Sequence, residues 1–389
     1  MGRPQRAVVG PHRLNRAGLT LSKIAVVAIG ATFALLGMLA GAYGPLLEHL
    51  THRFAVSLAA AGVAITVHFT GALIGVLVSM RFTERMSGRA SVTIASGSVG
   101  LGCALIALAT AWPVFLLGVF VVGLGFGSLV IGLNQLVAYS EGRRRGALLN
   151  AVNAAYSAGA VASPVLVSSF ARDHLSSLYA VAAVVALALI SGAAGISGRL
   201  PVAPSTRGRP PAIVWIFVSA FVVYTATETG TGGWMTSHLE SAGLASANAA
   251  TLTSGFWLAL VTGRLLITLV PESVPPPAIV LGGGALATAS LLLAVDGPLA
   301  PAAYVVTGLA LAPIFPTGIV WLARLRPGDA RATSWLFPAA MLGGALGPGA
   351  IGLLIIPLGV AIVPVMLATL AAGTLIAFLA AARSARLAQ

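Results

Sequence analysis

The stretch SGRLPVAPSTRGRPP, residues 197 to 211, interrupts a chain that is otherwise apolar over most of its length. It is basic and rich in proline, which is typical of a short linker, and it is too short to form a domain. Six apolar runs precede it and six follow it. We therefore predict an N-terminal half over residues 1–198, a linker over 199–211 and a C-terminal half over 212–389.

Each of the twelve runs is long enough to cross a membrane. A membrane helix needs roughly 20 apolar residues, because each residue rises 1.5 Å through a core about 30 Å thick. The chain is 58% hydrophobic and only 8% charged. The runs lie near residues 24–47, 57–80, 90–109, 112–138, 147–170, 177–198, 212–237, 247–270, 277–295, 299–323, 332–356 and 359–382. We predict an all-α protein of the lipid bilayer with twelve transmembrane helices in two six-helix bundles.

The net charge of +13 is spread over small clusters between the apolar runs. Because these clusters form no single patch with interleaved aromatic residues, nucleic acid is not an expected partner. With the N-terminus placed in the cytoplasm, the cytoplasmic segments hold every Lys and Arg except Arg53 and Arg172, and Arg264 is counted among them. This asymmetry predicts a multi-pass protein of the plasma membrane with both termini in the cytoplasm.

The sequence offers no pattern that points to enzyme chemistry. Cys103 is the only cysteine, and no Cys/His cluster has the spacing of a metal site. No Gly-x4-Gly-Lys-Ser/Thr sequence and no nucleophile with a recognisable base are present. We therefore expect no enzyme activity, no cofactor and no metal, and we expect any transport to depend on gradients.

The two halves show a faint internal repeat. ITVHFTGALIG aligns with LTSGFWLALVT, which matches Phe69 with Phe256 at an offset of 187 residues. SAGAVASPVL aligns with MLGGALGPGA, which matches Pro164 with Pro348 at an offset of 184 residues. Six helices return each half to the same side of the membrane, so the halves are expected to be related by an axis along the membrane normal.

Four motifs carry a resemblance to a known family. GPLLEHL ends the first run, GALLNAVNAAYSAGAVASPVL opens the fifth, GFWLALVTGRLL lies in the eighth and GLALAPIFPTG in the tenth. Over nearly its whole length the chain resembles the major facilitator superfamily, and within it the branch of the fucose/proton symporters and related sugar permeases. The resemblance implies a secondary transporter that moves a small molecule by alternating access. We expect it to act as a monomer.

The chain departs from the family pattern at two places. ERMSGR, residues 84 to 89, stands where the family's loop between helices 2 and 3 carries Asp-Arg-x-Gly-Arg. The resemblance implies that Glu84, Arg85 and Arg89 form a cytoplasmic gate latch in altered geometry. The fucose symporters also place acids on helices 1 and 4, where the alignment puts Gly44 and Val130. Because these carboxylates are absent, the sequence leaves two modes of transport open, proton-coupled transport and uniport.

TATETGTGGWMTSH, residues 225 to 238, places Glu228 deep within an apolar run. An ionisable side chain at the bilayer centre costs about 2.5 to 3.5 kcal/mol on insertion scales, so one that is kept is a candidate for function. Tyr224 and Thr231 fall on the same helical face as Glu228 and would line a cavity with it. The alternative is that Glu228 only accepts hydrogen bonds from a neighbouring helix.

The residues after Glu228 make the helix easy to deform. Gly230, Gly232 and Gly233 lower the cost of bending or unwinding, and broken helices are where many transporters bind substrate. Trp234 follows them and is a candidate to stack on a sugar ring. The alternatives are that the glycines only permit close packing and that Trp234 anchors the helix at an interface.

Other polar residues inside the runs are candidates for substrate contact. Asn153 and Tyr156 in the fifth run and Asn134 in the fourth suit a hydroxyl-rich substrate, which needs donors and acceptors but no counter-ion. For Asn134 a purely interhelical hydrogen bond is an equal alternative. His68 either titrates during transport or is a neutral, hydrogen-bonded histidine of the bundle. Trp257, like Trp234, either stacks on a sugar ring or anchors its helix at an interface.

Three classes of function were weighed. The leading hypothesis is a secondary transporter for a small, neutral, hydroxylated solute such as a sugar, with protons as a coupling partner through Glu228. The second is a proton antiporter that exports amphipathic or drug-like compounds, which the apolar interior favours. A receptor or lipid-handling enzyme on a transporter scaffold is disfavoured, because no catalytic constellation and no sizeable soluble domain are present.

Overall fold

The computed structural model describes residues 19–82, 86–140, 145–198, 210–271, 273–327 and 329–387. The predicted gate residues Glu84 and Arg85 and most of the predicted linker lie outside the described residues. Within them the chain is almost wholly helical. The one sheet found there is a two-residue antiparallel ladder between β1 (Thr20–Leu21) and β2 (Ile196–Ser197).

The first half of the chain forms six helices and a final 3₁₀ turn. They are α1 (Lys23–Gly41), α2 (Tyr43–Phe54), α3 (Leu58–Phe82), α4 (Gly88–Ala107), α5 (Trp112–Tyr139), α6 (Arg145–Leu189) and η1 (Ile190–Gly195). Local sequence sets several of the ends. Ser22 and Ser87 cap α1 and α4, because each side chain accepts a hydrogen bond from the amide three residues on. A kink at His174 (φ −135°, ψ 29°) separates the fifth and sixth spans, which are merged in α6.

The second half repeats this plan with more breaks. Its elements are α7 (Ala212–Ser241), α8 (Ser246–Leu266), η2 (Ile267–Leu269), α9 (Pro276–Leu293), η3 (Gly297–Leu299), α10 (Ala300–Leu311), α11 (Ile314–Leu325), α12 (Ala330–Ser334), α13 (Leu336–Leu358), η4 (Val360–Ile362) and α14 (Val363–Leu387). Gly359 ends α13 at φ 75°, a left-handed conformation that favours glycine.

Twelve helices are long and apolar enough to span a membrane, so this prediction is confirmed. The first span continues into α2 after a turn at Ala42, and the tenth divides into α10 and α11 at Ala312–Pro313. Proline lacks an amide hydrogen and clashes with the preceding turn, so Pro313 and Pro316 account for that division.

α7 differs from the expectation in one respect. Its helix is continuous from Ala212 to Ser241, so the glycines at its centre do not unwind it here. They permit close contact instead. A Cβ atom on Gly230 would lie 2.9 Å from the Ile351 side chain, and one on Gly232 would lie 2.7 Å from the indole of Trp257. The alternative interpretation, close packing, describes their role in this structure.

The two halves use the same scheme of helix contacts. In each half the first helix packs on the fifth (α1 on α6, α7 on α13) and the second on the fourth (α3 on α5, α8 on α10). The third packs on the sixth (α4 on the end of α6, α9 on α14). The repeat matches fit this scheme, because Phe69 and Phe256 lie on second helices and Pro164 and Pro348 on fifth helices. The prediction of two bundles related in parallel is thus confirmed.

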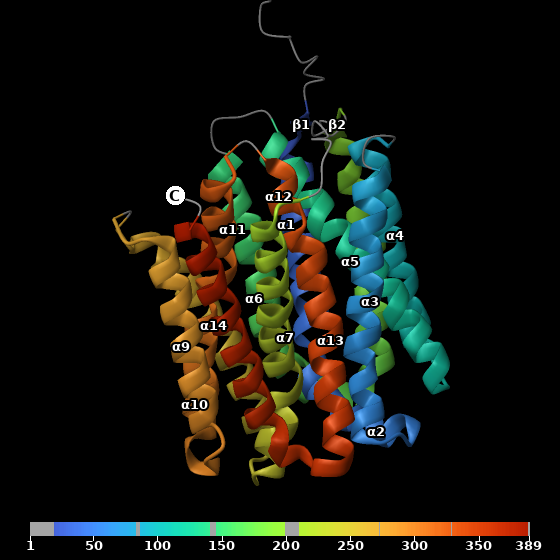
Figure 1. Ribbon diagram of the computed structural model, residues 1–389. Helices are drawn as coiled ribbons and strands as arrows, with labels where there is room; N and C mark the ends of the chain where they lie inside the picture. The colour runs from blue at the N-terminus through green and yellow to red at the C-terminus, as the bar shows by residue number, and fades with distance from the viewer. Residues whose placement is uncertain are drawn as a thin grey trace, which may run out of the picture.

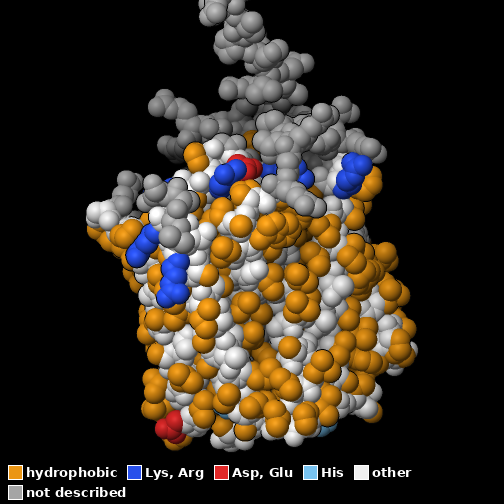
Figure 2. Space-filling view, viewed as in Figure 1, with side chains coloured by type: hydrophobic (Ala, Val, Ile, Leu, Met, Phe, Trp, Pro, Cys, Tyr) orange, Lys and Arg blue, Asp and Glu red, His pale blue; other side chains and the backbone are white. Residues whose placement is uncertain are grey.

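The described ends of the chain lie at the same end of the bundle, upper in Figure 1, which we term the termini side. The opposite end, where α2 lies, is termed the far side. α3 packs on α13, α6 on α8, and α2 on α7, and these contacts join the halves. Figure 2 shows hydrophobic side chains over the middle of the molecule and Lys and Arg gathered toward the termini side, as expected for a protein embedded in lipid.

Candidate polar site between the halves

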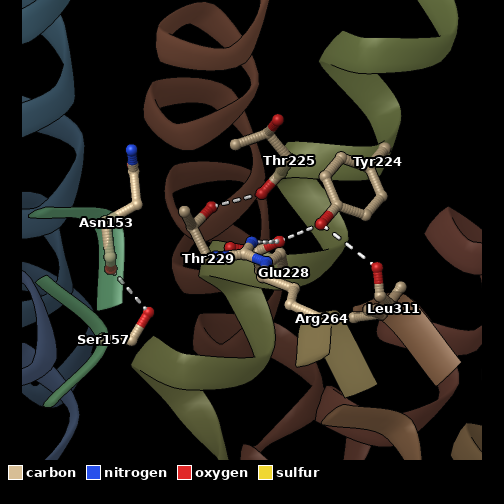
Figure 3. Close-up of polar contacts among 8 residues, drawn as sticks. All are labelled: Asn153, Ser157, Tyr224, Thr225, Glu228, Thr229, Arg264 and Leu311. Atoms are coloured by element: carbon tan, nitrogen blue, oxygen red, sulfur yellow. Dashed lines mark hydrogen bonds and ion pairs between the residues drawn. The ribbon is translucent and has the colours of Figure 1, made fainter. Parts of the chain in front are cut away.

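Two helices of the second half, α7 and α8, bring polar side chains together at Glu228. The Tyr224 hydroxyl, one turn earlier on α7, donates a hydrogen bond to the Glu228 carboxylate. Arg264 of α8 reaches the same carboxylate, with its Nη2 atom 3.5 Å from Glu228 Oε2. Figure 3 shows the three side chains pointing toward one another. The Glu228 side chain is 14% exposed and the Arg264 side chain 32% exposed, so the pair is largely shielded and yet within reach of solvent.

The break in the tenth span adds a backbone acceptor to this cluster. The Tyr224 hydroxyl lies 3.3 Å from the carbonyl oxygen of Leu311, the last residue of α10. A phenol has one proton, so Tyr224 can donate to Glu228 or to Leu311 but not fully to both. A protonated Glu228 can itself donate to Tyr224 and leave the phenol free for Leu311. The arrangement therefore offers a satisfied hydrogen-bond pattern for each protonation state of Glu228.

Arg264 lies in the last turn of α8, inside the span Ser246–Leu269, and its side chain faces Glu228. The positive-inside count places it among the cytoplasmic charges, and its pairing with Glu228 was not predicted. The apolar run drawn over 247–270 already enclosed it, and that was the available signal. Because the arginine balances the carboxylate, the centre of the molecule carries a neutral ion pair.

α7 and α8 pack as an antiparallel pair with a regular spacing. Three contacts, each four residues further along α7, join the two helices: Glu228 with Arg264, Gly232 with Trp257, and Thr236 with Thr253. The two threonine hydroxyls are 2.8 Å apart and buried. The ion pair is thus the charged member of a packing ladder, and its geometry depends on the Gly232–Trp257 contact beside it.

The first half presents amides and a phenol to this region. Asn153 on α6 donates a 3.0 Å hydrogen bond to the Asn134 side chain on α5, so the interhelical role considered for Asn134 is present. Asn153 itself is exposed. Tyr156 lies within electrostatic range of both Glu228 and Arg264. Figure 3 also draws Asn153 and Ser157 of α6, and Thr225 and Thr229 of α7, two hydroxyls that were not predicted from the sequence.

Two of the predicted site residues on α7 are fully buried. The Thr231 hydroxyl donates to the Thr227 carbonyl of its own helix, and its side chain is 0% exposed. Trp234 is also 0% exposed, and its Nε1 donates to the Pro348 carbonyl at 3.0 Å. Its ring lies against Gly62 of α3 and Gly352 of α13. In this conformation Trp234 joins the two halves and has no free face for a sugar ring.

His68 and Trp257 are buried, and each has one ring nitrogen that is not hydrogen-bonded among the described residues. The Tyr43 hydroxyl bonds to His68 Nδ1 at 2.9 Å, and the imidazole packs among Phe69 and Phe126. In the part of the chain that the structure describes, His68 Nε2 and Trp257 Nε1 have no hydrogen-bond partner. The packing of His68 is therefore that of a hydrogen-bonded histidine within the helix bundle. Trp257 lies two turns from Arg264 along α8.

Of the predicted gate residues, Arg89 can be placed. It is exposed near the start of α4 on the termini side. There it lines a hollow of about 470 Å³ with Ser87, Thr93 and Ser191. Among the described residues, no three His, Cys, Asp or Glu side chains lie together in a way that could hold a metal ion.

The fold and the site can now be compared with known proteins. The sequence profile of the Major Facilitator Superfamily matches residues 29–300. The chain belongs to the major facilitator superfamily. As a member of that superfamily it is a multi-pass membrane protein and a transporter. No curated protein sequence matches it.

Several solved structures of the superfamily share the fold. A mutant of the nucleoside transporter NupG is 14% identical with a TM-score of 0.73, and the match covers 92% of this chain and 100% of that chain. A mutant of the E. coli fucose:proton symporter FucP is 16% identical with a TM-score of 0.65, covering 92% and 98%. A D-xylose-proton symporter is 14% identical with a TM-score of 0.74, covering 91% and 96%. At these identities the likeness shows the fold alone.

Proposed function

We propose that this transporter moves a small, neutral, hydroxylated solute, of the sugar or nucleoside kind, by alternating access between its two halves. The observation that carries the proposal is the Glu228–Arg264 pair, which leaves the polar centre without net charge. Around it lie hydroxyls, phenols and amides, which donate to and accept from hydroxyl groups without a counter-ion. The similar structures named for nucleosides, fucose and xylose support the same class of solute.

Glu228 and Arg264 are proposed to bind the solute together. A carboxylate next to a guanidinium offers both an acceptor and a row of donors, the pattern that a vicinal diol uses. Because Glu228 is already paired with Arg264, we assign it to solute binding rather than to carrying a coupling proton. Asn153 and Tyr156 would contact the solute from the first half.

The orientation and domain boundaries belong to the same proposal. We place the termini side in the cytoplasm, the halves at 1–198 and 212–389, and the linker at 199–211. Among the described basic residues, Lys23, Arg81, Arg89, Arg324, Arg331 and Arg386 lie at termini-side helix ends, whereas Arg53 lies on the far side. This distribution supports cytoplasmic termini under the positive-inside rule.

A thermal-shift screen of the purified protein tests the proposed solute class. A ligand that binds only the folded state raises the apparent melting temperature. We expect neutral sugars or nucleosides to raise it, and lipophilic cations and sugar acids to leave it unchanged. The E228Q and R264Q variants should lose the shift, while D329N, which alters the half-buried Arg326–Asp329 pair outside the proposed site, should keep it. Stabilisation by lipophilic cations alone, or an undiminished sugar shift in E228Q, would contradict the proposal.

A further inference from the structure

The ring of Trp234 lies where the two halves meet, between Glu228 and the far side. Trp234 follows Glu228 by six residues on the continuous helix α7, which places it about 9 Å further toward the far side. Its side chain is fully buried. A solute that reaches Glu228 from the far side, between the halves, therefore has to pass the position that Trp234 occupies.

Two contacts with α13 hold the Trp234 ring in place. Its Nε1 donates to the Pro348 carbonyl at 3.0 Å, and a Cβ atom on Gly352 would lie 3.1 Å from Cζ2 of the ring. Pro348 and Gly352 belong to the same half as Trp234, so both contacts can persist when the halves move apart as rigid units. The ring is thus a fixed knob on the surface of the second half.

Gly62 of α3 supplies the matching hole on the first half. A Cβ atom on Gly62 would overlap Cζ2 of the Trp234 ring and would lie 2.6 Å from Cη2, so the edge of the indole rests directly on the glycine backbone. Packed interiors do not accommodate an added carbon at such a separation without movement. Any side chain at position 62 therefore has to push the halves apart or displace the ring.

The contacts deeper in the junction come from the same face of α3. Thr66 donates to the Ala345 carbonyl of α13 at 3.0 Å, and a Cβ atom on Gly344 of α13 would lie 2.5 Å from the Phe69 ring. Thr66 and Phe69 follow Gly62 by four and seven residues, so the three share one helical face. The far side is thus closed by one continuous surface between the halves, with the Trp234–Gly62 contact at its outer end.

We propose that Trp234 and Gly62 form the gate of the far side, and that the size of the side chain at position 62 sets the balance between conformations with this end closed and open. The inference rests on the proposed function, because alternating access requires the halves to separate at this end. In the proposed orientation the far side is extracellular, so the knob leaves the hole when solute enters or leaves through the outer side. Glu228 and Arg264 lie outside this contact and keep their role in solute binding.

Distance measurements between spin labels on the far side test the proposal. In a C103S background, labels at the exposed positions Ser57 of the first half and Ala247 of α8 report the separation of the halves in lipid nanodiscs without solute. We expect a mainly short distance in this parent protein, since the far side is closed in the structure.

A single methyl group at position 62 should shift the distances. In G62A we expect the closed-to-open ratio to fall by about tenfold, because the added carbon overpacks the closed conformation and has room in the open one. The matched control is G30A. Gly30 lies on α1 of the same half and has open space around it, so its replacement should leave the distance distribution unchanged.

A second substitution distinguishes the gate from a general loss of packing. Phenylalanine lacks the two ring atoms that the new methyl group would meet, so W234F makes room for it. We expect G62A/W234F to return toward the short distance of the parent, because substitutions at two residues in contact are not additive. An unchanged distribution in G62A, or a double variant at least as open as G62A, would overturn the proposal. Because no solute is present, either result is independent of the thermal-shift screen that tests the proposed solute class.

Discussion

The indole of Trp257 lies so close to Gly232 that a Cβ atom on the glycine would stand 2.7 Å from the ring. This contact brings α8 against α7 one turn from the Glu228–Arg264 pair. The absence of a side chain at position 232 thus sets how near Arg264 can come to Glu228. The same glycine faces Gly44 of α2 through its carbonyl, so it serves contacts both within the second half and between the halves.

Replacing Gly232 should therefore disturb the site without touching either charge. We expect G232A to lower the free energy of unfolding by about 1–3 kcal/mol, the usual cost of overpacking, and to weaken solute binding. The measurement is chemical unfolding in mixed micelles together with the thermal-shift response. The matched control is G282A, since Gly282 is also in a helix but has open space around it and alanine favours helix. Equal stability of G232A and G282A would refute the packing argument.

The ion pair should behave as a coupled unit in a double-mutant cycle. We expect E228Q and R264Q each to cost about 1–3 kcal/mol of unfolding free energy, less than a fully buried pair, because the Arg264 side chain keeps 32% of its exposure. The double variant should cost less than the sum of the two by about 1 kcal/mol. Strict additivity in unfolding experiments would show that the two side chains do not interact.

Tyr224 joins Glu228 to the break in the tenth span, so its hydroxyl should matter for both stability and binding. We expect Y224F to cost about 1 kcal/mol of unfolding free energy, the net value of one hydrogen bond. The same variant should lose more free energy of solute binding than free energy of unfolding. Y139F removes the hydroxyl of an exposed tyrosine at the end of α5 and serves as the control. If Y224F binds solute like the wild type, the phenol has no role in the site.

Cysteine labelling checks the proposed orientation. Cys103 is the one cysteine of the sequence and is buried, so a C103S background leaves no native thiol to react with the label. An impermeant maleimide added outside intact cells should label D296C on the far side and spare R386C near the end of α14. Labelling of R386C under these conditions, with D296C protected, would invert the assignment of inside and outside.

The helices could be predicted from sequence because apolar length alone specifies a membrane span. Glu228 was found by the same logic, as an acid within an apolar run. Arg264 was not recognised as a site residue, because the positive-inside count treats an arginine near a helix end as cytoplasmic. Its partner becomes visible only through the packing of α8 on α7.

Two further features lie beyond what residue types can indicate. The Leu311 carbonyl is a backbone group, and it becomes available to Tyr224 only because the helix divides at Ala312–Pro313. The glycines after Glu228 allow bending and close packing equally well, so the sequence could not distinguish these roles. The neighbours of Gly230 and Gly232 in other helices do distinguish them.

The short ladder between Thr20–Leu21 and Ile196–Ser197 fastens the start of the first helix to the end of the sixth. The entry and exit points of the chain into the N-terminal half therefore stand side by side. A unit whose two ends coincide in space tolerates being cut at its boundary or reconnected in a new order. This geometry permits the N-terminal half to be produced as a separate polypeptide or as a circular permutant, with its internal contacts intact.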